Sequence, residues 1–101
     1  MKLKPVELHP GARLDAIEAV EWYESQEAGL GARFLQELAA AERFIGRHPL
    51  LGTPHFYGSR KRPLKVFPYT LIYSDEPSLV FVLAIAHYSR EPDYWLHRLV
   101  A

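Results

Sequence analysis

The chain has 101 residues, of which 49% are hydrophobic and 24% charged, and its formal net charge is zero. This length suits one domain over residues 1–101, and the composition excludes an intrinsically disordered chain. The absence of cysteine excludes disulfides and thiolate chemistry. The first residues lack the apolar core of a signal peptide, and no apolar run approaches the ~20 residues of a membrane span. We therefore expect a cytoplasmic protein that does not enter membranes.

Positive charge is concentrated in the middle of the chain. No acidic residue lies between Glu42 and Asp75, whereas that stretch holds six basic ones: Arg43, Arg47, Arg60, Lys61, Arg62 and Lys65. A protein that binds long duplex DNA through its phosphates is usually basic overall. One basic patch on a neutral chain instead favours a small anionic ligand or an acidic protein partner.

The first half of the chain predicts a short strand and two helices. Residues 2–8 read as a strand, which Pro5 confines to a sheet edge because proline cannot donate a ladder hydrogen bond. A helical pattern follows, with one apolar face: Ala16, Ile17, Val20 and Tyr23. After Gly29-Leu30-Gly31 a second helix runs to just before Pro49. The short glycine-containing joint predicts an antiparallel helical hairpin.

The second half predicts three strands, at about 61–67, 69–75 and 79–87. Residues 75–78 have the composition of a turn, and a tight reversal is expected at Phe67-Pro68-Tyr69. Strict alternation in the last strand places Leu79, Phe81, Leu83 and Ile85 on one face and Val80, Val82, Ala84 and Ala86 on the other. The predicted fold class is α+β: an edge strand, a helical hairpin packed on a small antiparallel sheet, and a short helical C-terminal tail.

Three stretches of the chain, in order and in register, resemble the RelE/ParE superfamily of bacterial toxin–antitoxin toxins, often labelled plasmid stabilisation proteins. The first runs from Trp22-Tyr23-Glu24 to His48-Pro49, and the second from Arg62 to Ile72-Tyr73. The third begins at Val82, passes His87 and Arg90-Glu91-Pro92, and ends at Arg98. The resemblance implies the toxin of a type II module, which forms a hetero-oligomer with a cognate antitoxin.

The superfamily contains two activities, and the residues suffice for either. RelE-like members cut mRNA on the ribosome, which needs a proton acceptor, positive charge near the phosphate and a donor for the leaving oxygen. The candidates for these catalytic roles are His87, Tyr88, Arg62, Lys65 and Arg90. ParE-like members poison DNA gyrase without hydrolysing anything. In that case the basic patch and the tail form a binding surface: Arg60, Lys61, Arg62, Tyr94, Trp95 and Arg98.

The ParE-like reading is favoured, because the expected nuclease site lacks the glutamate or the denser set of cations by which the nucleases resemble one another. Two alternatives stay open: an endoribonuclease, and a degenerate toxin that serves mainly as antitoxin partner. The acid-free segment predicts an antitoxin with an acidic or amphipathic tail, docked by strand addition or as a helix in a groove. The histidines show no metal-ligand spacing, so we expect neither a metal nor a cofactor.

Simpler readings compete with several of these assignments. Tyr94 and Trp95 are more typical of core or antitoxin-facing aromatics than of a platform on which bases stack. His87 is also typical of a hydrogen-bonded residue at a sheet edge. Arg60-Lys61-Arg62 could be a solvated edge that discourages pairing between sheets. For His87 and the basic triplet, both the structural and the functional role stay open.

Overall fold

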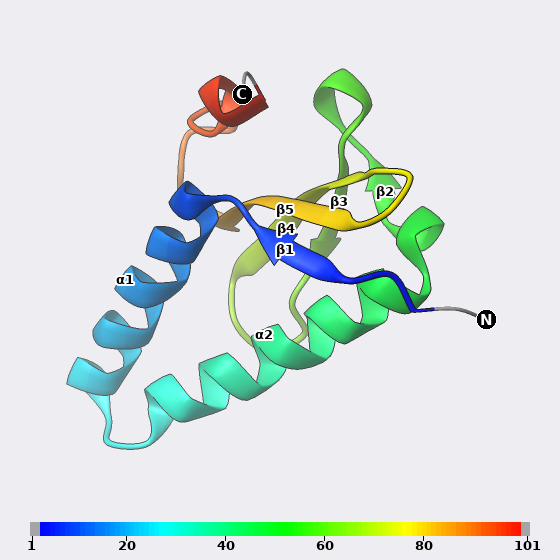
Figure 1. The fold of residues 1–101 in the computed structure, drawn as a ribbon. Coiled ribbons are helices and arrows are strands. Elements are labelled where there is room, and N and C mark those ends of the chain that lie inside the picture. Colours follow the sequence, from blue (N-terminus) through cyan, green and yellow to red (C-terminus); the bar gives the residue numbers. More distant parts are fainter. Residues whose placement is uncertain (1–2, 100–101) are drawn as a thin grey trace.

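The computed structural model describes residues 3–99, which form two helices on one face of a five-stranded sheet (Figure 1). The helices are α1 (Pro10–Gln26) and α2 (Leu30–Arg47). The strands are β1 (Val6–Leu8), β2 (Thr53–Pro54), β3 (Arg60–Pro63), β4 (Tyr69–Asp75) and β5 (Val80–His87). Short 3-10 turns are η1 (Pro49–Leu51), η2 (Phe56–Gly58) and η3 (Leu96–Leu99). Within the described residues, no helix is long and apolar enough to span a membrane.

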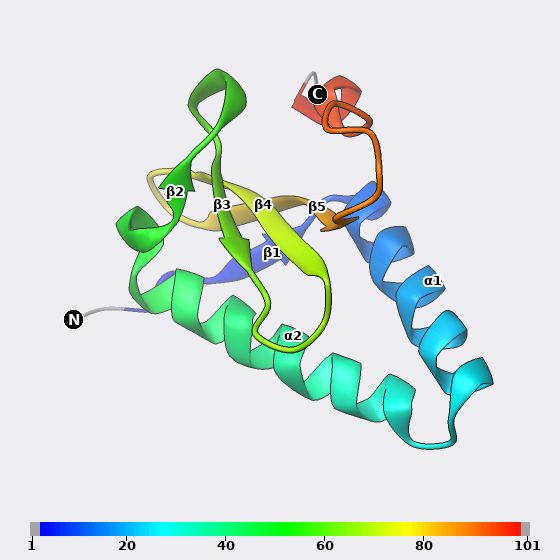
Figure 2. The same cartoon turned by 180° about the vertical axis from the view of Figure 1, so that it is seen from behind.

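The sheet has the order β1-β5-β4-β3-β2, which confirms the predicted α+β class (Figure 2). Three of its four pairings are antiparallel, but β1 runs parallel to β5, so the sheet is mixed and not purely antiparallel. The predicted strand at 2–8 is an edge strand, as expected, although it covers only Val6–Leu8 and residue 2 lies outside the described part of the chain. The C-terminal helical tail is present as η3.

The strand predicted at 61–67 is shorter in the structure, because β3 ends at Pro63. Proline has no N–H to continue a ladder, and Pro68 stands at the far end of the same segment. The chain between them turns back on itself: Leu64 N–H donates to the Tyr69 carbonyl at 2.9 Å, and Tyr69 N–H donates to the Phe67 carbonyl at 2.8 Å. The predicted reversal at Phe67-Pro68-Tyr69 is therefore confirmed, within a longer loop.

A bulge in β5 changes which side chains face the helices. Ile72 pairs with Ala84, whereas the next residue, Tyr73, pairs with Val82, so Leu83 is an extra residue in β5. As a result, Val80, Val82 and Ile85 pack in the cluster under the helices. Leu83, Ala84 and Ala86, with partly buried Phe81, pack on the other face. The strict alternation predicted for this strand is therefore wrong across the bulge.

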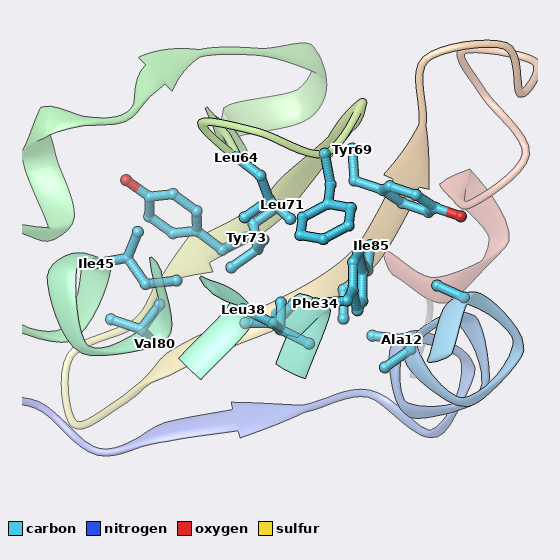
Figure 3. Packing of buried hydrophobic residues seen from close by; sticks show 14 residues of the cluster. Ala12, Phe34, Leu38, Ile45, Leu64, Tyr69, Leu71, Tyr73, Val80 and Ile85 are labelled. Carbon is cyan, nitrogen blue, oxygen red and sulfur yellow. The ribbon is translucent and has the colours of Figure 1, made fainter. Parts of the chain in front are cut away.

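The main core lies between the helices and the sheet and is centred on Phe34 of α2, as Figure 3 shows. The Phe34 ring is 5.1–5.5 Å, centroid to centroid, from the rings of Tyr23, Phe67 and Tyr69. Such stacked and edge-on aromatic pairs stabilise a core beyond the area they bury. Ile17, expected on this apolar face, is 49% exposed. Asp15 is turned towards the sheet instead and is 8% exposed.

The joint between the helices explains why Glu24 and Gly29-Leu30-Gly31 occur together in the first of the three stretches. The Glu24 carboxylate accepts hydrogen bonds from Gly29 N–H at 3.0 Å and from Gly31 N–H at 3.0 Å, both at the start of α2. These amides have no partner within the helix, so the carboxylate caps it. Gly29 has a φ of 89°, which favours glycine. A Cβ at Gly31 would lie 2.9 Å from the Val20 carbonyl oxygen, so glycine lets the helices approach closely.

Candidate functional site

A cavity of about 390 Å³ opens on the sheet face opposite the helices. Its floor includes Ile72 and Ala86, which belong to the second apolar cluster. Its walls come from two segments that rise on the same side of the sheet in Figures 1 and 2: the connection from β2 to β3, and the chain after β5. His55 comes from the first segment and Lys61 from the adjoining strand β3, whereas the end of β5 and the chain after it contribute His87, Tyr88, Arg90, Glu91 and Pro92. The cavity thus joins polar groups from two separate segments of the second half of the chain.

His87 is held in one orientation at the end of β5. Its Nδ1 lies 3.0 Å from the Ser89 backbone nitrogen and 2.8 Å from Ser89 Oγ. Because Nδ1 accepts the Ser89 amide proton, the neutral ring carries its own proton on Nε2. The ring also meets Tyr69 edge-on, with the centroids 5.0 Å apart. His87 therefore offers a hydrogen-bond donor.

His55 is a cavity residue that the sequence showed only as one of five histidines. Its ring stacks on Phe56 at 4.5 Å and on Trp95 at 5.8 Å between centroids. Burial, and then the charge of Lys61, lower the pKa of His55 and favour its neutral form. No local pattern marks this position, because Trp95 reaches it only through the folded tail. The histidine next to Phe56-Tyr57-Gly58 was the one available signal, and it is weak.

Arg62 and Lys65 lie away from this cavity. They line a smaller groove of about 160 Å³ between α2 and β3, with Glu37, Ala40, Ala41 and Phe44. The Arg62 guanidinium sits over the Phe44 ring, 3.9 Å from its centroid. Successive strand residues point to opposite faces, so Lys61 reaches the cavity while Arg62 reaches α2. The structure thus brings together His87, Tyr88 and Arg90, and separates them from Arg62 and Lys65.

Arg60, the first residue of β3, has a structural role because it holds the loop between α2 and β2. Its guanidinium donates hydrogen bonds to the carbonyls of Gly52 at 2.8 Å and Leu50 at 3.2 Å. The Tyr73 hydroxyl helps by donating to the Pro49 carbonyl at 2.7 Å and accepting from Gly52 N–H at 3.0 Å. The basic triplet therefore divides between three places: Arg60 fixes the loop, Lys61 lines the cavity and Arg62 lines the groove.

The C-terminal tail is anchored by Asp15 of α1. Its Oδ2 accepts hydrogen bonds from Arg98 Nη1 at 2.8 Å, the Tyr94 hydroxyl at 3.0 Å and Ile85 N–H at 3.1 Å. Burial and the nearby Asp15 carboxylate raise the pKa of Tyr94, so its hydroxyl keeps its proton. Trp95 is completely buried. In this conformation Tyr94, Trp95 and Arg98 hold the tail on the sheet, and Trp95 offers no surface to a partner.

Comparisons with known proteins place the chain in a family. A family model described as the ParE toxin of the type II toxin–antitoxin system parDE matches residues 6–92. The chain belongs to the ParE toxin family. A solved structure titled "Chromosomal ParDE TA system from P. aeruginosa" is similar, with a TM-score of 0.75 and 13% sequence identity. The similarity covers 84% of this chain and 96% of that one, and at this identity it shows a shared fold. No curated protein matches the sequence.

The resemblance to the RelE/ParE superfamily is thus confirmed on its ParE side. In this ParE family member the third stretch, Val82 to Arg98, contributes both to the cavity and to the packing of the tail on the sheet. Its His87 to Arg90 portion lines the cavity, and its Tyr94 to Arg98 portion closes the second face of the sheet. The described residues contain no cluster of three or more potential metal ligands.

Proposed function

We propose that this toxin of a type II toxin–antitoxin module inhibits DNA gyrase as a binding protein and is neutralised by a cognate antitoxin. Family membership supports the toxin role. The observation that carries the choice of target is the separation of Arg62 and Lys65 from His87, Tyr88 and Arg90 by the thickness of the sheet. Cleavage of RNA needs its cations and its proton-transfer groups around one phosphate. The five candidates do not form such a site, which favours a non-hydrolytic mechanism.

For the antitoxin, we propose the groove between α2 and β3 as the docking surface. Its floor is apolar, from Ala40, Ala41 and Phe44, and its rim carries Arg62 and Lys65. Arg47 follows Phe44 by three residues, so it extends this side of α2. An apolar floor with a cationic rim complements an acidic amphipathic segment.

The backbone of β3 favours a helix over an added strand in this groove. β2 pairs only with Arg60 and Lys61, so the outer edge of β3 beyond them is not covered by β2. That edge is poor in donors, because Pro63 has no N–H and the backbone N–H groups of Lys65 and Val66 both donate to the Glu37 carboxylate. A strand would find few partners there, whereas a helix needs only the side-chain surface.

The choice of target is tested by measuring gyrase and RNA in the same system. We expect purified toxin to inhibit gyrase supercoiling in vitro, and induced expression to stop growth while translated messages stay intact. Addition of the cognate antitoxin should restore supercoiling. Early cleavage of messages with unchanged supercoiling would establish the endoribonuclease instead. Normal growth on induction, with tight antitoxin binding, would show a degenerate toxin.

The docking surface is tested by reversing one charge on each face of β3. Arg62→Glu is expected to weaken antitoxin binding by roughly tenfold or more, about 1.4 kcal/mol or more, because it places an acid at the rim beside an acidic partner. Lys61→Glu is the matched control, since this neighbour points to the opposite face and should leave affinity unchanged. Affinities would be measured by calorimetry on folded variants. Equal losses in the two variants would place the antitoxin elsewhere.

A further inference from the structure

The cavity is not used by the function proposed above, yet it combines three kinds of surface around one space. It has an apolar floor at Ile72 and Ala86, an aromatic ring at His55, and a basic rim at Lys61, His87 and Arg90. We propose that this cavity binds a nucleotide, with the base against the floor and His55 and the phosphate at the basic rim. The proposal concerns binding without cleavage, and it stands independently of gyrase inhibition.

The rim has positive charge that the protein does not neutralise with an ion pair. Within residues 3–99 the two ion pairs are Lys4 with Asp75 and Arg98 with Asp15, so neither Lys61 nor Arg90 belongs to one. Glu91 is the one acid among the residues lining the cavity. The Arg90 guanidinium is held in place over the Tyr94 ring, 3.9 Å from its centroid. Lys61, the positioned Arg90 and the His87 Nε2–H together provide hydrogen-bond donors that a phosphate accepts.

The floor contains a polar atom that needs a partner. Thr70 lines the cavity, and its Oγ1 is buried without a hydrogen-bond partner within the described structure. Buried hydroxyls are nearly always paired, so a ligand atom at this point would satisfy it. The neutral His55 ring adds both a donor and an acceptor. These groups match the mixed donors and acceptors on the edge of a nucleobase.

The size of the cavity distinguishes a nucleotide from a simple anion. Small-molecule sites usually measure ≈ 300–1,000 Å³, and 390 Å³ lies in that range. Inorganic phosphate would fill the rim and leave the apolar floor in water. A nucleoside would fill the floor and leave the cations without an anion. A nucleotide uses both parts, whether it is free or is the terminal residue of a single strand.

The test is a titration of the full chain with 5′-AMP, monitored by backbone amide NMR shifts. We expect saturable shifts at Lys61, Thr70 and His87, and binding at least tenfold tighter than that of adenosine or of inorganic phosphate. A 5′-phosphorylated dinucleotide shows whether the natural ligand is a free nucleotide or the end of a single strand. If the dinucleotide binds more tightly than 5′-AMP, the ligand is a strand end. If it binds equally or more weakly, the ligand is a free nucleotide. Either result supports the site.

Variants make the assignment specific. Lys61→Ala and Arg90→Ala should each weaken 5′-AMP binding at least tenfold, whereas Lys65→Ala, on the opposite side of the sheet, should not. Thr70→Val keeps the side-chain shape, and it should weaken binding without unfolding the protein. Three results would overturn the proposal: no saturable shift at millimolar 5′-AMP, binding of phosphate as tight as that of 5′-AMP, or an equal loss in Lys65→Ala. None of them would bear on gyrase inhibition, which is measured separately.

Discussion

Replacement of Asp15 by alanine is expected to lower the free energy of unfolding by about 3–5 kcal/mol, the range for breaking a buried ion pair by removing one partner. The side chains of Asp15 and Arg98 are 7% and 9% exposed, so the guanidinium would keep its charge with little access to water. The substitution also removes the acceptor of Ile85 N–H and of the Tyr94 hydroxyl. One carboxylate thus serves α1, β5 and the tail together.

The measurement is urea unfolding followed by circular dichroism. Asp93→Ala is the matched control, because Asp93 is an exposed aspartate in the tail and should change stability by less than about 0.5 kcal/mol. Asp15→Asn keeps an oxygen acceptor, so its loss in free energy of unfolding should lie between those of Asp15→Ala and Asp93→Ala. The double variant Asp15→Ala with Arg98→Met should cost less than the sum of the single changes, since both side chains act in one network. Additive losses would show that the pair is not coupled.

Replacement of Trp95 by alanine is expected to cost about 3–5 kcal/mol, because the side chain is fully buried and its removal leaves a large cavity. Trp95 packs in the second cluster with Ile72, Leu83 and Ala84, and its ring also supports His55. The loss of this one side chain should therefore loosen the tail and the aromatic wall of the cavity together.

Trp22 provides the matched control for Trp95. It is 58% exposed on α1, so Trp22→Ala should change the free energy of unfolding by less than about 0.5 kcal/mol. In a Trp22→Phe background, Trp95 fluorescence should report a buried indole in the native state and shift to the red on unfolding. If Trp95→Ala instead kept full stability and lost gyrase inhibition, Trp95 would be a contact residue that the tail exposes to gyrase.

The sequence by itself determined the elements whose signals are local. Both helices follow from the spacing of apolar residues such as Phe34 and Leu38, and the hinge between them from Gly29 and Gly31. The antiparallel pairing of β4 with β5 follows from a four-residue turn. Three stretches that resemble the RelE/ParE superfamily, in the same order and register, also indicated the right superfamily. These features depend on residues close in the chain, where periodicity and turn chemistry suffice.

Only the tertiary structure decided which polar residues share a site. Asp15 and Arg98 are 83 positions apart, and nothing near either residue indicates the other. The bulge at Leu83 exchanges faces within β5, because pairing with β4 overrides alternation along the strand. Lys61 and Arg62 are neighbours in sequence but lie on opposite faces of the sheet. The alternation of side chains along β3 therefore divides the basic segment: Lys61 lines the cavity and Arg62 lines the groove. Composition alone cannot show this division.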